Sequence, residues 1–66
     1  MEITVNGQPR TIGQGLTITA LLAEIGVQPG RIAVELNQQL VPKAEHGTTV
    51  LTAGDQVEVV TFVGGG

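Results

Sequence analysis

The residues best suited to do chemistry are the last four of the sequence, Val63, Gly64, Gly65 and Gly66. Consecutive glycines have no side chains that could pack, and each would lose roughly 1–2 kcal/mol of backbone entropy on ordering. The run therefore predicts a flexible tail, which when extended would carry the α-carboxylate of Gly66 about 13–14 Å from the domain. A tail without Cβ atoms could pass through a narrow channel into another protein's active site. A frayed terminus and a leftover linker are the alternatives.

No other residues predict a catalytic or metal site. The sequence contains no cysteine and no serine, which excludes thiol and serine hydrolase chemistry and thiolate metal sites. His46 is the only histidine, and we interpret it as a solvated loop residue rather than a metal ligand. Glu35 and Glu58 could face each other across a sheet as a general acid and base, but solvated strand carboxylates explain them better.

Composition limits the classes of protein that fit. A chain of 66 residues forms one domain at most and buries only about 60% of its unfolded surface. The net charge of −3 and the single aromatic residue, Phe62, argue against nucleic acid as a partner. We find neither a signal peptide nor an apolar stretch long enough to span a membrane, and we expect a soluble cytoplasmic protein without a membrane partner.

The first elements expected are a hairpin and a helix. Residues 2–6 alternate between apolar and polar, Asn6-Gly7 favours a two-residue turn, and Pro9 places the returning strand at a sheet edge. A helix follows, with Thr17 as N-cap and Gly26 just past its end. Its apolar positions have the i, i+3, i+4, i+7 spacing of a stripe that a sheet must cover: Ile18, Leu21, Leu22 and Ile25.

The second half of the sequence predicts three further strands. After a turn over residues 28–30, residues 31–36 alternate, Asn37-Gln38 turns the chain into a short strand over residues 39–41, and Pro42 stops it. Residues 43–49 read as a loop with room for one helical turn. Val50 and Leu51 are expected to close the bottom of the core.

The last strand, residues 56–62, follows the turn at Gly54-Asp55 and directs Val57 and Val59 to one face and Glu58, Val60 and Phe62 to the other. One helix can cover only one face of such a sheet. We therefore predict an α+β roll whose other sheet face is partly open.

In combination these features resemble the ThiS family, the sulfur carriers of thiamine biosynthesis. The resemblance covers the whole chain and rests on the strand order, residues 33–37 (AVELN), residues 54–60 (GDQVEVV) and the final Gly65-Gly66. It implies a ubiquitin-like β-grasp fold: a mixed four- to five-stranded sheet on one short helix, with the domain spanning residues 1–63 and a flexible glycine tail at residues 64–66. Thr61-Phe62-Val63 stands where the related small subunits of molybdopterin synthase often carry prolines, which favours the thiamine pathway.

The resemblance also implies a reaction in which all catalytic groups belong to partners, so that this chain is a co-substrate and not an enzyme. An E1-like adenylyltransferase of the ThiF type would use Mg-ATP to adenylate Gly66, with Gly64 and Gly65 threading its active site. Sulfur from a cysteine desulfurase persulfide would then form a thiocarboxylate, and a thiazole synthase of the ThiG type would take that sulfur. No cofactor or metal is expected on this chain.

Docking needs a surface next to the tail, and we expect Val60, Phe62 and Val63 to provide it; alternatively Val60 and Phe62 lie under a loop or are singly exposed. The acidic composition suggests a basic rim on the partner. Two other functions stay open: a carrier for molybdopterin, tRNA thiolation or protein conjugation, and a passive β-grasp interaction module.

Overall fold

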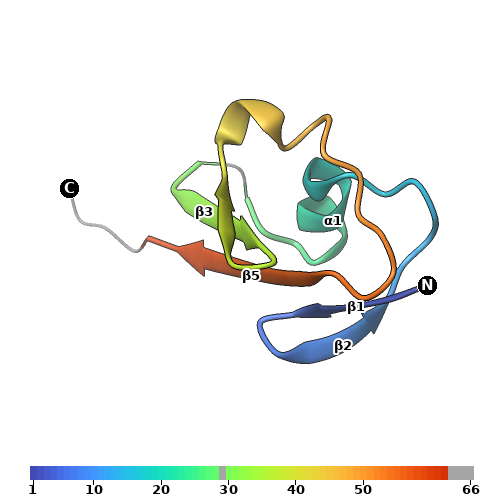
Figure 1. Cartoon of the computed structure of the whole chain (residues 1–66). Coiled ribbons are helices and arrows are strands. Elements are labelled where there is room, and N and C mark those ends of the chain that lie inside the picture. The colour runs from blue at the N-terminus through green and yellow to red at the C-terminus, as the bar shows by residue number, and fades with distance from the viewer. Residues whose placement is uncertain (29, 63–66) are drawn as a thin grey trace.

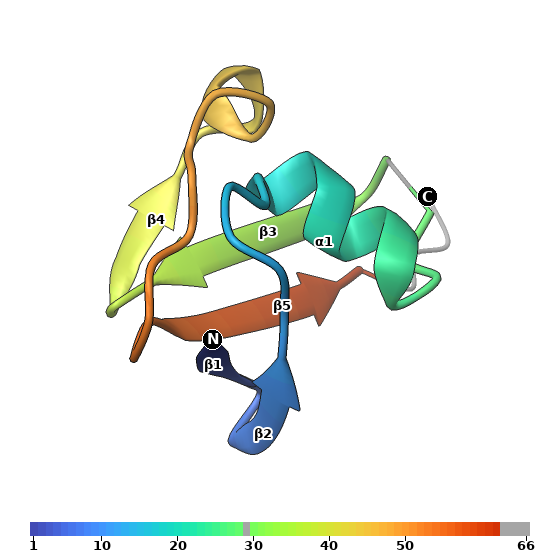
Figure 2. The same cartoon turned by 90° about the vertical axis from the view of Figure 1, so that its right-hand side faces the viewer.

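The computed structural model describes residues 1–28 and 30–62 and has five strands in one mixed sheet, in the order β2-β1-β5-β3-β4. Helix α1 and the 3-10 turn η1 lie on the same side of this sheet (Figures 1 and 2). The elements are β1 (Glu2–Val5), β2 (Gln8–Thr11), α1 (Ile18–Glu24), β3 (Ile32–Leu36), β4 (Gln39–Val41), η1 (Lys43–Glu45) and β5 (Gln56–Thr61). This is the α+β architecture predicted from the sequence.

The hairpin of β1 and β2 forms as expected from its turn residues. Val5 pairs with Gln8, and the two residues between them, Asn6 and Gly7, take φ values of 50° and 81°. Both values lie in the left-handed region that a two-residue hairpin turn of type I′ requires. Strand β2, which contains Pro9, lies at the edge of the sheet, as predicted.

Helix α1 has the predicted boundaries and the predicted buried stripe. The hydroxyl of Thr17 accepts a hydrogen bond from the Ala20 backbone N–H at 3.2 Å, which satisfies one of the free donors of the first turn. Gly26 follows the C-cap with φ 79°, a value that glycine adopts without steric cost. Ile18, Leu21 and Leu22 are buried against the sheet.

Strands β3 and β4 form a second hairpin, whose turn residues Asn37 and Gln38 have φ values of 51° and 69°. The segment expected to be a loop, residues 43–49, begins with one helical turn, η1, as its length allowed. The predicted turn at residues 28–30 includes Pro29, which lies outside the described residues.

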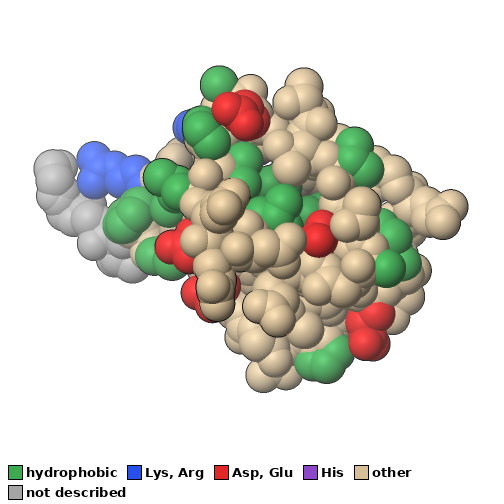
Figure 3. Space-filling model, viewed as in Figure 1, with side chains coloured by type: hydrophobic (Ala, Val, Ile, Leu, Met, Phe, Trp, Pro, Cys, Tyr) green, Lys and Arg blue, Asp and Glu red, His purple; other side chains and the backbone are tan. Residues whose placement is uncertain are grey.

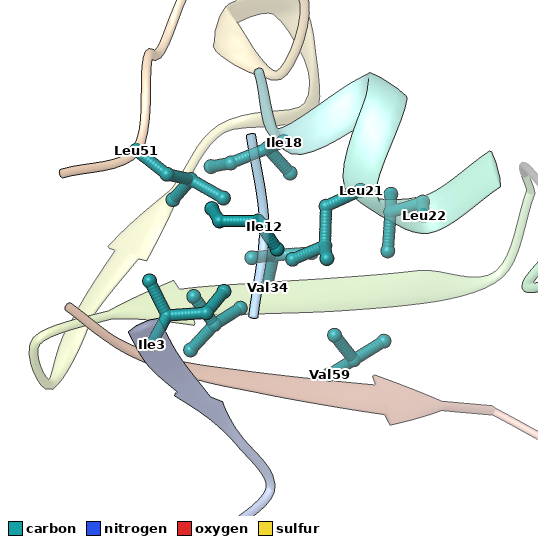
Figure 4. Close-up of a cluster of buried hydrophobic side chains, with 9 residues drawn as sticks. Ile3, Ile12, Ile18, Leu21, Leu22, Val34, Leu51 and Val59 are labelled. Atoms are coloured by element: carbon teal, nitrogen blue, oxygen red, sulfur yellow. The ribbon is translucent and has the colours of Figure 1, made fainter. Parts of the chain in front are cut away.

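The core lies between α1 and the sheet (Figure 4) and contains nine buried apolar side chains: Ile3, Ile12, Ile18, Leu21, Leu22, Val34, Leu51, Val57 and Val59. Leu51 is buried as predicted, but the prediction for Val50 is wrong, since 51% of its surface is exposed. The Leu51 N–H donates to the Leu16 carbonyl, and Val50 forms an isolated antiparallel β-bridge with Thr17. In such an extended pair successive side chains point in opposite directions, so only one of them can enter the core.

Strand β5 occupies the centre of the sheet, parallel to β1 and antiparallel to β3. Val57 and Val59 point into the core, with 1% and 9% of their surface exposed. Strand β5, which precedes the C-terminal residues, is therefore hydrogen-bonded to a strand on each side, and one of its faces packs against the core.

Candidate functional site

The face of the sheet opposite α1 carries exposed apolar side chains at the end of β5. Val60 is 46% exposed and Phe62 is 57% exposed, which confirms the prediction that both face away from the helix. In Figure 3 hydrophobic side chains gather around this end of β5, with acidic side chains beside them. We call Val60, Phe62 and Leu40 the open-face patch; Leu40 is 67% exposed.

The sequence did not indicate that Leu40 belongs to this surface, because a strand of three residues has too few positions to show which side is inward. The sheet register supplies the missing information. Leu40 lies opposite Glu35 on β3, and Glu35 lies opposite Glu58 on β5. Paired residues share a face of the sheet, so Leu40 points to the same side as Glu58 and therefore Val60.

The side chains on the open face change from acidic to apolar along β5. Glu58 and Glu35 form one cross-strand row, and Val60 and Ala33 form the next row of that face. Beyond them the Phe62 N–H donates to the Arg31 carbonyl at 2.8 Å, which extends the contact with the β3 side of the sheet past the end of β5. Val60 and Ala33 therefore form an apolar row between the acidic row and Phe62.

Glu35 and Glu58, which the sequence allowed to face each other across a sheet, do lie opposite each other, and both are exposed. Within residues 1–28 and 30–62, no salt bridge joins either carboxylate to a cation. Their interpretation as solvated strand residues agrees with this exposure.

Four of the residues on which the sequence hypothesis depends, Val63, Gly64, Gly65 and Gly66, lie outside the described residues. The docking role of Val63, the threading of Gly64 and Gly65 and the chemistry of Gly66 stay predictions.

Two asparagines that the sequence analysis treated only as turn residues hold β5 in place. The Asn6 side chain accepts from the Val59 N–H at 2.7 Å and donates to the Val59 carbonyl at 3.2 Å. The Asn37 side chain accepts from the Gln56 N–H at 2.9 Å and donates to Asp55 at 3.1 Å. An asparagine at the first position of each hairpin turn was visible in the sequence, but its partner 19 or 53 residues away was not.

Comparison with known proteins decides the family. The family model described as "ThiS family" matches residues 3–66. The chain belongs to the ThiS family. A solved structure described as the thiamine biosynthesis protein ThiS of Geobacter metallireducens matches with a TM-score of 0.86 and 38% identity, and the match covers 100% of both chains.

Curated relatives of this ThiS-family chain are of two sizes. The sulfur carrier protein ThiS of Thermus thermophilus is 38% identical, over 97% of this chain and 98% of the relative. A thiazole synthase of Paramagnetospirillum magneticum is 39% identical over all 66 residues, which span only 20% of its length. A ThiS-like sequence thus occurs both as a protein of this size and as part of a longer thiazole synthase.

On the helix side of this ThiS-family domain, the interpretation of His46 as a solvated residue is wrong. Only 5% of its surface is exposed, and its Nε2 lies 3.0 Å from the Val41 carbonyl oxygen. Because η1 folds back towards α1, the ring borders a largely apolar hollow of about 290 Å³ together with Leu22 and Val27. Among the described residues, His46 belongs to no group of three or more side chains suited to hold a metal ion.

The part of the chain that the structure describes contains no helix long and apolar enough to cross a bilayer.

Proposed function

We propose that this chain is a sulfur carrier of thiazole biosynthesis, a protein co-substrate and not an enzyme, which acts through the carboxyl group of Gly66. The observation that carries the proposal is a full-length match to ThiS proteins in a fold whose central strand leads from an exposed apolar face directly to the glycine residues. The proposal places the protein in the cytoplasm, where Mg-ATP is available to its partner.

The carboxyl group must be activated before it can take up sulfur. An α-carboxyl group has a pKa near ~3.3–3.7, so at neutral pH it is a carboxylate that resists attack by nucleophiles. In the proposed reaction an E1-like adenylating enzyme joins Gly66 to AMP and releases pyrophosphate from Mg-ATP. The terminal sulfur of a persulfide supplied by a cysteine desulfurase then attacks the acyl-adenylate, which releases AMP and forms an acyl disulfide. A second thiol attacks the other sulfur of this disulfide, forms a new disulfide with it and leaves a terminal thiocarboxylate on Gly66. The glycines at positions 64 and 65 enter the partner's channel as backbone alone.

Thiazole synthase is the proposed recipient of the sulfur. The support is the thiazole synthase that contains a region 39% identical to this whole chain, because a carrier and its recipient that share one polypeptide work on the same product. The open-face patch, together with Val63, is the proposed docking surface for the partners. An exposed aromatic and two exposed aliphatic side chains on one face are typical of the apolar centre of an interface.

Intact-mass analysis of the protein purified from its source cells tests the proposal. We expect a fraction in which one oxygen atom is replaced by sulfur, and we expect that fraction to disappear when Gly66 is deleted or the adenylating enzyme is inactivated. Absence of the sulfur-containing form in cells starved for thiamine would contradict a carrier role.

A growth experiment separates the thiamine pathway from the other carrier pathways. Cells that lack this protein should grow without thiamine when the thiazole moiety is supplied. Failure of thiazole to restore growth would assign the carrier to molybdopterin synthesis, tRNA thiolation or protein conjugation instead.

A further inference from the structure

The hollow of about 290 Å³ between α1 and η1 has a largely apolar lining. Leu22 on α1 is buried in the core, and Val27 and Ile32 are half-buried and pack against that core. Thr19 and Ala23 complete the lining on the helix side. Ligand pockets have volumes of about 300–1,000 Å³ and are mostly apolar with a few polar groups, so the hollow suits a small molecule.

Two polar side chains of η1 border this hollow. Residues three apart lie on the same side of a 3-10 helix, and Lys43 and His46 have this spacing. Among the described residues that line the hollow, Lys43 carries the only permanent charge, and none is an aspartate or glutamate. The Thr19 N–H donates to the His46 carbonyl at 3.0 Å, which holds η1 against α1. An anion in the hollow therefore meets one positive charge and no negative one.

His46 has one ring nitrogen left for a ligand. Its Nε2 lies 3.0 Å from the Val41 carbonyl oxygen, which can only accept, so Nε2 carries the proton and Nδ1 of the neutral ring is an acceptor. Within residues 1–28 and 30–62, no hydrogen bond reaches Nδ1. Solvent reaches this atom although only 5% of the residue is exposed. Since the ring borders the hollow, Nδ1 is available to a donor group of a bound molecule.

We propose that this hollow binds a small carboxylic acid with an apolar chain and one hydroxyl group. The carboxylate pairs with the Lys43 ammonium group, the hydroxyl donates to Nδ1 of His46, and the apolar chain covers Leu22. A singly charged carboxylate suits one cation better than a phosphate monoester, which carries about −1.5 to −2 charges at pH 7. Binding there is independent of the proposed function, because α1 and η1 lie on the side of the sheet opposite the open-face patch (Figure 2).

An NMR titration of the labelled protein with leucate, the hydroxy acid related to leucine, tests this site. The amides of Leu22, Val27 and His46 should shift in a saturable way, while those of Glu58 and Val60 on the open face should stay in place. Two matched probes separate the contacts: isocaproate lacks the hydroxyl group, and the amide of leucic acid lacks the charge. Each should bind about threefold to tenfold more weakly than leucate.

Substitutions in the lining test the same contacts from the side of the protein. Lys43→Gln should raise the Kd of leucate about fivefold, the upper end for an exposed ion pair, and should abolish the preference for the acid over its amide. Ala23→Leu keeps a good helix former at an exposed position but fills the hollow, so binding should be lost while the melting temperature is retained. The matched control is Arg10→Gln, which removes the same charge from a residue outside the lining and should leave Kd unchanged.

The inference is overturned by the absence of saturable shifts at the hollow, by equal affinity for leucate and its amide, or by equal weakening in Arg10→Gln. It is also overturned if these amides respond to the adenylating enzyme or to higher concentrations of the chain itself and not to leucate, since the hollow is then a protein interface. None of these results bears on the carrier role, which intact-mass analysis tests separately.

Discussion

Replacement of Asn6 by glycine removes the side chain that holds β5 beyond the end of its pairing with β1. Only Thr4 and Val5 pair with β5 in the sheet register, and the Asn6 side chain then makes two hydrogen bonds to the backbone of Val59. Glycine keeps the φ of 50° accessible, so the substitution tests the side chain and not the turn conformation.

The expected loss follows from these two bonds. A hydrogen bond contributes about 0.5–1.5 kcal/mol net, so Asn6→Gly should cost about 2 kcal/mol of unfolding free energy. A domain of 66 residues has only about 3–10 kcal/mol in total at ~0.05–0.15 kcal/mol per residue. At about 4–8 °C per kcal/mol for a domain of this size, the melting temperature should fall by roughly 8–16 °C.

The matched control is Gln38→Gly in the turn between β3 and β4. Gln38 also has a positive φ, 69°, but its side chain makes no hydrogen bond with the described residues. Relief of the left-handed conformation contributes roughly 1–2 kcal/mol of stability. The greater freedom of glycine in the unfolded chain offsets about 0.4–1 kcal/mol of this gain, so a net stabilisation of up to about 1 kcal/mol is expected. The two glycine substitutions are therefore expected to change stability in opposite directions.

Urea unfolding of both variants and amide hydrogen exchange of the wild type and Asn6→Gly provide the measurements. In Asn6→Gly the Val59 amide should lose more protection than the Val34 amide on β3. If both glycine variants shift stability in the same direction, or if Val59 keeps its protection, the Asn6 side chain does not hold β5 and the reasoning is wrong.

Three further substitutions test the helix, the core and the open face. Thr17→Ala should destabilise the protein by about 1 kcal/mol in urea unfolding, because the hydroxyl no longer accepts the Ala20 N–H, whereas Thr17→Ser should retain most of the stability. Leu21→Ala removes a fully buried side chain and should cost about 2.7–5 kcal/mol, enough to leave a large unfolded fraction by circular dichroism at 37 °C. Phe62→Ala should change unfolding free energy by less than about 0.5 kcal/mol because the ring is 57% exposed, but should slow adenylation of the chain; unchanged adenylation would count against the docking surface.

The features that could be predicted from the sequence are those whose causes are local. Asn6-Gly7 requires positive φ at adjacent positions, and the turn forms there. Thr17 and Gly26 mark the two ends of α1 through local effects: the Thr17 hydroxyl caps a backbone N–H three residues later, and Gly26 itself takes the positive φ that ends the helix. Alternation along β5 predicted which side chains face away from the helix because neighbouring side chains of a strand point to opposite faces.

Other features depend on partners that are distant in sequence. His46 is buried because η1 folds back towards α1, and nothing in the residues around it indicates that approach. The contacts of Asn6 and Asn37 with β5 arise only when both hairpin turns lie beside the same central strand. The exposed position of Leu40 becomes visible only through its register with β3.

Strand β5 connects the stability of this domain to its proposed function through register. Its odd-numbered valines fill the core and its even-numbered residues form the open face, so a shift of pairing by one residue would exchange the two sets. The asparagine bonds oppose such a shift, because Asn6 binds the backbone of Val59 and Asn37 binds that of Gln56. The side chains of two turn residues thereby determine which residues of β5 a partner would meet.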